Sequence, residues 1–265
     1  MTLPTTKSFK ELEASRAPFD ASLSSEFHVS QTPDPNWKPG QGCNEVHDCQ
    51  AEAIGDGATG SEEAGGRRYA QRIIVPGETE VDPMEVYRLL HGFVAPRPIA
   101  LVTTQSTSGQ INLCPMSWFQ LVSHDPPLVM LSFGGDEERR KDSEVNVEET
   151  REFTISSVSE SYAEAANFAA AAAPKGLSEY ALTGLTPIAS HKVRPPRVKE
   201  APFSIECRLD FRREYYRDGS AVNSFQHDTA QTEQRGRMTT VLVIGRIVAI
   251  HFRPDCIDGN GFVVR

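Results

Sequence analysis

Apolar residues are distributed unevenly along the chain, and their pattern predicts strands in its later part. The first seventy or so residues show no sustained apolar period, whereas short β-branched runs separated by polar turns begin at Ile73. Runs of this length are typical of strands in a folded sheet. Strands are expected over residues 98–104, 111–123, 127–133, 152–158, 203–211 and 239–252, the last of them bent at Gly245.

Short helices are expected between these strands. Residues 82–92 begin with an Asp-Pro pair, carry an apolar stripe and end at a glycine, which predicts a helix before the first strand. Ser161 and Glu164 form a capping-box pattern ahead of an alanine-rich run, so a second helix is expected over 161–173. Ser143 is placed to cap a third, shorter helix.

The order of these elements restricts the fold class. Strands and helices do not alternate regularly, which excludes a doubly wound parallel sheet. The pattern favours a mainly β fold with inserted helices, namely a closed or split antiparallel barrel with Greek-key-like connections. We therefore expect one folded domain over residues 71–265, behind an N-terminal arm over 1–70 that is partly disordered.

The arm contains two different kinds of segment. Proline-rich residues near 30–42 suit an extended anchor, and low-complexity residues 51–68 suit a mobile loop. Residues 55–60 spell a dinucleotide-binding glycine pattern, but no strand and helix flank it, so we set it aside. A metal site is not expected from the few candidate ligands here, which are Cys43, His47 and Cys49.

Charge and composition exclude some classes of protein. The formal net charge of −9 argues against binding to nucleic acid or to an anionic membrane, because both would be repelled. No apolar run is long enough to span a bilayer, and the first residues do not resemble a secretory signal. Five scattered cysteines favour reduced thiols over a disulfide framework. A soluble, cytoplasmic protein is therefore expected.

Several separated motifs resemble one known family in their order. They are PRPIALVTT, GQINLCPMSWFQLVSHDPPLVMLSF, RKDSEVNVEETREFTI and GLTPIASHKVRPPRVKEAPFSIECRL. Together they cover roughly residues 85–255 and are similar to the flavin reductase-like, FMN-binding split-barrel family. The segment from Pro35 to Gly40 echoes a proline-rich arm of that family's fungal-type branch. The resemblance implies an FMN-binding split β-barrel that forms a homodimer.

The resemblance also implies which residues hold the flavin, between Thr103 and Asn146. Its phosphate and ribityl chain would lie against Asn112, Pro115, Ser117, Lys141 and Ser143, and its ring against Thr103, Thr104, Cys114 and Ser132. Asp142 and Asn146 complete the set of residues expected to bind the cofactor. A phosphate needs hydroxyls, N–H groups and a cation in one place, which part of this set supplies. Cys114 stands where the family commonly has alanine. No catalytic side chain and no metal ligand are assigned.

Each of these residues also has a simpler interpretation. Arg139, Arg140 and Lys141 lie among acidic residues and would ordinarily be a solvated surface run. Thr103 and Thr104 are common strand formers. Only the joint order of the motifs favours a flavin site.

The function that the resemblance implies is an FMN-dependent oxidoreductase of the flavin reductase-like kind. It would take a hydride from NADH or NADPH and pass electrons to flavin, oxygen or another acceptor. Two alternatives remain: a non-catalytic FMN-binding redox partner protein, and a split-barrel oxidase acting on a specific small metabolite. Both stay open because the Gly-Asp-His segment of many family reductases is absent near 239–252. The family's Arg-Leu-Gly-Gly-like segment is also absent after residues 261–265, which predicts a C-terminally incomplete or divergent domain.

Overall fold

A computed structural model describes residues 38–39, 73–75, 82–135, 140–171, 173, 177–223 and 237–258. Contacts divide the chain into two units, residues 1–83 and 84–265. Almost all of the expected arm, including the anchor apart from Lys38 and Pro39, the loop, the glycine pattern and Cys43, His47 and Cys49, lies outside the described residues. The division into an arm and a domain over 71–265 stays a prediction.

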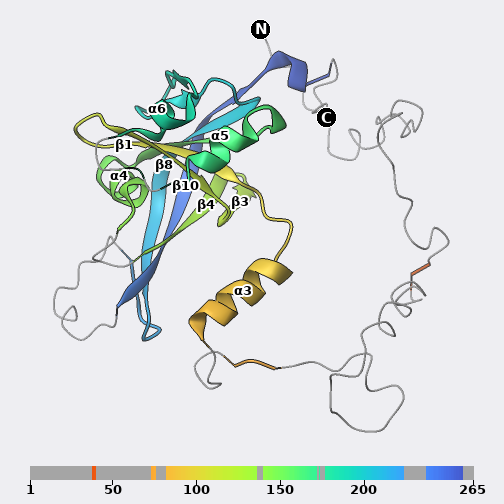
Figure 1. Ribbon diagram of the computed structural model, residues 1–265, viewed down its shortest axis with the longest axis vertical. Coiled ribbons are helices and arrows are strands. Elements are labelled where there is room, and N and C mark those ends of the chain that lie inside the picture. The colour runs from red at the N-terminus through yellow and green to blue at the C-terminus, as the bar shows by residue number, and fades with distance from the viewer. Residues whose placement is uncertain are drawn as a thin grey trace. The chain divides into compact units, whose positions relative to one another are not determined.

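The second unit is built on one antiparallel sheet (Figure 1). Its strands are β1 (Ala100–Gln105), β2 (Ile111–Met116), β3 (Phe119–His124), β4 (Pro127–Gly134), β5 (Glu152–Ser157), β8 (Phe203–Tyr216), β9 (Ala221–Asn223) and β10 (Met238–Phe252). They pair in the order β2-β1-β5-β8-β10-β4-β3, and β9 pairs with β8. A separate two-stranded ladder joins β6 (Pro187–Ile188) to β7 (Arg197–Val198).

The sheet curls around an apolar core. Val102 on β1 and Met116 on β2, at one end of the strand order, share a buried cluster with Leu131 on β4, at the other end. The two edge strands β2 and β3 do not pair, although only Ser117 and Trp118 separate them in the chain. This arrangement is a split antiparallel barrel, and it confirms the expected fold class. We call the join at residues 117–118 the seam.

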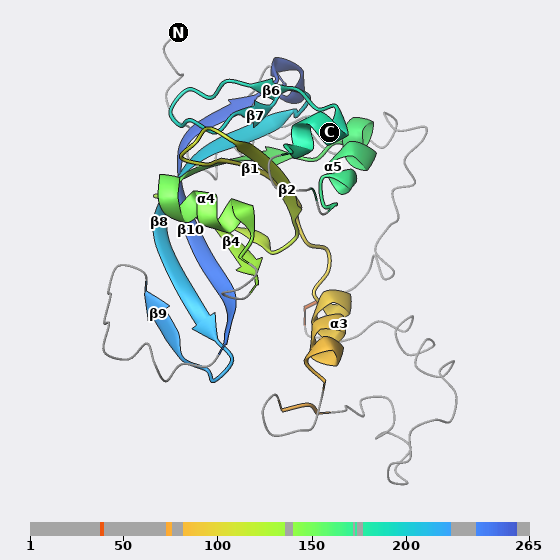
Figure 2. The same cartoon turned by 60° about the vertical axis from the view of Figure 1, so that its left-hand side comes forward.

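Helices are inserted between the strands along the chain. Two of them lie against the barrel in Figure 2, and the one that precedes β1 stands away from it. The helices are α3 (Pro83–Phe93), α4 (Asp142–Thr150), α5 (Ala163–Phe168) and α6 (Glu179–Thr183), with 3₁₀ turns η2 (Glu160–Tyr162) and η4 (Pro254–Cys256). A second buried cluster packs Leu101 and Leu113 of the sheet against Ala166 of α5 and Tyr180 of α6. None of the described helices is long and apolar enough to cross a membrane.

The structure corrects several local predictions. The strand expected over 111–123 is two strands, because the chain leaves the β1 ladder after Met116 and joins β4 from Phe119. The strand expected to end at residue 211 continues to Tyr216, because β10 remains beside it and supplies backbone partners.

Two predicted helix caps are wrong. Ser161 does not cap: its hydroxyl lies 3.2 Å from that of Ser159, and α5 ends at Phe168, before the predicted end at residue 173. Ser143 lies inside α4, whose N-cap is Lys141, and its side chain is turned into the protein toward Asn112. In both cases a nearby polar partner takes the hydroxyl that the cap would have used.

Gly245 permits a close approach in the middle of β10. A shift in register between β10 and β8 occurs at this residue, in agreement with the bend predicted there. A Cβ atom at Gly245 would lie 2.3 Å from Cζ of Phe153, whose ring is fully buried in the core. The glycine is therefore required by packing rather than by backbone conformation.

Gly245→Ala should destabilise the protein by about 1–3 kcal/mol, because the ring of Phe153 must move within a filled core. Gly92→Ala is the matched control, since nothing lies within 4 Å of a Cβ at that helical position. It should be neutral or stabilising by up to about 1 kcal/mol. Urea unfolding of both variants measures the difference, and equal stabilities would contradict the packing argument.

Candidate functional site

A cleft of about 400 Å³ opens at the seam, within the range usual for small-molecule sites. It brings together residues that are far apart in sequence. Its lining consists of Tyr87 and His91 of α3, Pro115, Met116, Ser117 and Trp118 at the seam, Ser132 and Gly134 of β4, Lys141, and Thr239 and Thr240 of β10. Four residues predicted to bind flavin, Pro115, Ser117, Ser132 and Lys141, are among them.

The polar groups of this seam cleft suit an anion. Lys141 is exposed and stands at the N-cap of α4, where the helix dipole adds positive potential. No described side chain caps the helix start, so the first N–H groups remain for a ligand. Hydroxyls come from Ser117, Ser132 and the two threonines of β10. Among the residues that the structure describes, the cleft lining holds no carboxylate.

A neighbouring hollow of about 230 Å³ has the opposite character. Three of the predicted flavin ligands, Asn112, Asp142 and Asn146, line it. Glu149 and Glu179 also line it, and none of its described lining residues is a lysine or arginine. A phosphate would be repelled there. The structure therefore places four of the predicted residues in a cationic cleft and three in an acidic hollow.

Asn112 and Ser143 belong to a hydrogen-bonded chain beside the acidic hollow, which Asn112 and Glu179 line. The Ser143 hydroxyl donates to the Asn112 side-chain oxygen over 2.6 Å when the Asn112 amide nitrogen donates to both Glu179 oxygens, at 3.1 and 3.3 Å. Glu179 also accepts the Leu113 backbone N–H at 2.8 Å. This chain fixes β2 against α4 and α6. Asn112 and Ser143 are thus held beneath the α4 N-terminus.

Thr103 and Thr104 are fully buried, and both hydroxyls already have partners. The Thr103 hydroxyl lies 2.8 Å from that of Tyr180 on α6, and Thr104 accepts from the Asn146 amide at 3.0 Å. Tyr180 has its pKa raised mainly by burial, so its hydroxyl keeps its proton. In this chain Thr103 therefore holds α6 against the sheet, and Thr104 holds α4 against it. A direct contact with flavin stays a prediction for them.

Cys114 is half-buried on β2, beside the seam cleft but not among its lining residues. Burial raises the pKa of its thiol, and the charge of Lys141 opposes that shift. Its sulfur lies 3.6 Å from the carbonyl oxygen of Pro115. The side chain is therefore a neutral thiol packed behind the cleft wall.

His91 and Trp118 were not predicted as site residues. The Trp118 indole N–H donates to Nε2 of His91 at 3.1 Å, and Nδ1 of His91 lies 2.9 Å from the Tyr87 carbonyl oxygen. Because indole only donates and a carbonyl only accepts, these two contacts fit the tautomer of His91 that carries a hydrogen on Nδ1. Trp118 is 46% exposed and presents a flat apolar face at the seam. The one feature of the sequence that could have indicated this part of the site is the tryptophan inside a family motif.

Comparison with known proteins identifies the class. The flavin reductase-like domain family matches residues 93–261, so the chain belongs to this family of flavin-dependent oxidoreductases. An uncharacterized protein of Bacillus subtilis, YwrF, is 35% identical over 186 residues, which are 70% of this chain and 83% of that protein.

Two solved structures show the same relationship. Nitrilotriacetate monooxygenase component B from Bacillus cereus is 33% identical, with a TM-score of 0.60 over 73% of this chain and 87% of that one. 2-Nitrobenzoate 2-nitroreductase NbaA from Pseudomonas fluorescens is 28% identical, with a TM-score of 0.56 over 73% of this chain and 82% of that one. The family expectation from the motifs is confirmed, and membership of the fungal-type branch stays a prediction.

Proposed function

We propose that the protein binds FMN in the seam cleft and uses it to accept a hydride from NADH or NADPH. The observation that carries this proposal is the cationic lining, in which Lys141 and several hydroxyls face one space without a described carboxylate. Bound FMN would supply the hydride chemistry. The chain would hold the phosphate at Lys141 and the α4 N-terminus, and present Trp118 to the apolar ring.

FMN is preferred over FAD in this proposal because Lys141 and the exposed helix start suit a terminal phosphate carrying about two charges. Calorimetry with FMN, FAD and riboflavin tests the site. FMN should bind most tightly. Tighter binding of FAD, or no binding of any flavin, would refute the assignment.

Nicotinamide oxidation is tested by mixing the FMN-loaded protein anaerobically with NADH and, separately, with NADPH. Bleaching of the flavin absorbance is the expected result with at least one of them. The alternative is a non-catalytic FMN-binding redox partner, favoured by the lack of a Gly-Asp-His segment along β10 (Met238–Phe252). Tight FMN binding without bleaching would support that alternative.

We also propose that the protein is a homodimer. Two adjoining elements, joined by the Trp118–His91 hydrogen bond, expose large apolar side chains. These side chains are Tyr87, Leu89, Leu90, Phe93 and Val94 on and after α3, and Trp118, Leu121 and Val122 at and after the seam. Large exposed apolar patches on soluble proteins often mark interaction sites, so we expect a second copy to cover these side chains. Because they adjoin the seam cleft, a second copy seated there would also shield the flavin.

Leu90→Glu should dissociate this dimer, because a carboxylate buried without a partner costs about 3 kcal/mol or more, hence at least about a hundredfold in affinity. Phe252→Glu is the control, since that side chain is 54% exposed at the far end of β10. Sedimentation should show a monomer only for the first variant. A monomeric wild-type protein at micromolar concentration would refute the dimer.

A cytoplasmic location belongs to the same proposal. Cys114, Cys207 and Cys256, the cysteines in the part of the chain that the structure describes, are all free thiols. Free thiols suit a reducing compartment.

A further inference from the structure

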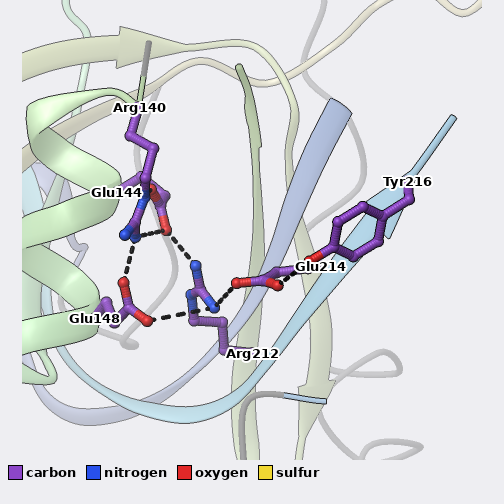
Figure 3. Close-up of polar contacts among 6 residues, drawn as sticks. All are labelled: Arg140, Glu144, Glu148, Arg212, Glu214 and Tyr216. Atoms are coloured by element: carbon purple, nitrogen blue, oxygen red, sulfur yellow. Dashed lines mark hydrogen bonds and ion pairs between the residues drawn. The ribbon is translucent and has the colours of Figure 1, made fainter. Parts of the chain in front are cut away.

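A cluster of charged side chains lies between helix α4 and strand β8 (Figure 3). At its centre is Arg212 of β8, which is 2% exposed. Its guanidinium contacts Glu144 at 2.6 Å, Glu214 at 2.6 Å and Glu148 at 3.5 Å. Tyr216 donates to Glu214 at 2.7 Å. Arginine is seldom buried so completely unless it is paired, as Arg212 is here.

A bulge in β8 directs Arg212 inward. Leu209 pairs with Gly245 and Phe211 pairs with Ile244, so Asp210 is an extra residue in the ladder. Such an insertion exchanges the two faces of a strand. Cys207 and Leu209 face the core before the bulge, and Tyr216 faces it afterwards. Simple alternation from Leu209 would place Arg212 on the outer face of the strand. Because of the bulge, Arg212 instead lies on the inner face.

The partner that matters for the flavin site is Glu144. It lies in the first turn of α4, three residues after Lys141, and it is 3% exposed. Residues three apart are neighbours on a helix surface, so an uncompensated carboxylate there would oppose an anion at Lys141. Arg140 also donates to both Glu144 oxygens, each at 2.6 Å. Arg140 and Arg212 thus both compensate Glu144 beneath the helix start, and they share their charge with Glu148 and Glu214.

Both arginines remain charged in this environment. Burial lowers the pKa of Arg212, but the hydrogen bonds that its guanidinium donates to Glu144 and Glu214 outweigh burial, and the pKa is raised. The pKa of Arg140 is raised chiefly by its hydrogen bond to Glu144. The neutralisation of Glu144 is therefore permanent at physiological pH.

We propose that Arg212 is a positioning residue of the flavin-phosphate subsite, which acts by neutralising Glu144 and so keeps the start of helix α4 electropositive toward a phosphate. It acts through Glu144 and Arg140 and does not touch the ligand. This inference rests on the proposed binding of FMN at Lys141, and it adds an electrostatic determinant of FMN recognition that lies outside the cleft.

A purely structural ion cluster would behave differently under substitution. Arg212→Met leaves Glu144 with less compensation, whereas Glu144→Gln leaves both arginines with more positive charge. If the cluster only holds α4 in place, both changes should weaken FMN and riboflavin alike. If it sets the potential at the phosphate, Arg212→Met should weaken FMN binding, Glu144→Gln should leave FMN binding equal or stronger, and both should leave riboflavin nearly unchanged.

The experiment measures FMN and riboflavin affinities of the full chain by fluorescence quenching, and the ratio of the two is the readout. Arg212→Met should lower the preference for FMN by about tenfold or more, and Glu144→Gln should preserve or raise it. The double variant Arg212→Met, Glu144→Leu removes both charges and should recover most of the preference. Arg246→Met is the matched control, because Arg246 pairs with Asp210 at 2.7 Å on the exposed side of the barrel.

Each outcome is decisive. An unchanged preference in Arg212→Met, or a loss of preference in Glu144→Gln, would overturn the inference while leaving FMN binding intact. If Arg212→Met fails to fold, Glu144→Gln and the double variant still decide the sign. Wild-type protein that binds FMN no better than riboflavin would instead refute the phosphate subsite itself, and with it the proposed function.

Discussion

Replacing Lys141 with alanine is expected to weaken FMN binding about ten- to a hundredfold, because a charge-assisted hydrogen bond worth roughly 1.5–3 kcal/mol is lost. Lys141 lines the seam cleft and stands at the N-cap of α4, so its ammonium group can reach a phosphate that the helix start also attracts. Riboflavin lacks that phosphate, and its affinity should hardly change.

Lys192→Ala is the control for this substitution. Lys192 is exposed, and it lies in a loop that does not line the seam cleft, so both variants remove one positive charge. Its effect on FMN affinity should stay below about 1 kcal/mol. Equal effects of the two substitutions would indicate diffuse attraction that salt screens. An unchanged FMN affinity in Lys141→Ala at low salt would contradict the assignment of the phosphate to this cleft.

Glu206→Gln is expected to destabilise the fold by about 1.5–3 kcal/mol at neutral pH, because several charge-assisted hydrogen bonds converge on one buried carboxylate. Glu206 is fully buried on β8. Its oxygens accept the backbone N–H groups of His191 at 2.6 Å, Lys192 at 2.5 Å and Val193 at 3.2 Å. These bonds fix the loop that precedes β7 (Arg197–Val198) against the barrel.

The stabilisation by Glu206 should depend on pH in a defined direction. Burial raises the pKa of Glu206, but the loop N–H groups and His251, whose Nε2 lies 2.6 Å away, outweigh it and lower the pKa below its ordinary value of 4.5. A lowered folded-state pKa means that the contribution is fully present above the unfolded pKa. It is lost as the pH falls through the folded value.

Urea unfolding at pH 7 and at several values below 4.5 tests this prediction. The stability difference between wild type and Glu206→Gln should be large at pH 7 and shrink in acid. Glu160→Gln, at an exposed position in η2 (Glu160–Tyr162), should show little difference at any pH. A difference that stays constant from pH 7 into strong acid would show that the charge of Glu206 contributes nothing.

Local sequence patterns were sufficient to locate most strands and the helix before β1 (Ala100–Gln105). Those elements depend on β-branched runs, turn residues and terminal signals that act over a few neighbouring positions. The order of the motifs was likewise enough to indicate the family, and part of the flavin set, including Ser117, Ser132 and Lys141, does line one cleft.

The two predictions of helix caps were wrong because a serine hydroxyl can cap a helix only if no other polar group takes its hydrogen bond. Ser143 had the right spacing to cap α4, but Asn112 of β2 (Ile111–Met116) is within 2.6 Å of it. Short helices such as α6 (Glu179–Thr183) were not predicted, because tertiary contacts rather than local sequence also determine them. Five residues carry too little periodicity to be recognised, and tertiary packing of Tyr180 against the barrel stabilises them.

The sequence by itself determined the strand-rich fold class, the family and the polar residues available to a flavin. Only the tertiary structure decided how those residues are divided, because Thr103 and Asn112 face α6 while Ser117 and Ser132 meet Lys141 across the seam. It also decided that Arg212 points inward, since one extra residue in β8 exchanges the faces of the strand. Contacts of this kind join positions far apart in the chain, and local patterns carry no information about them.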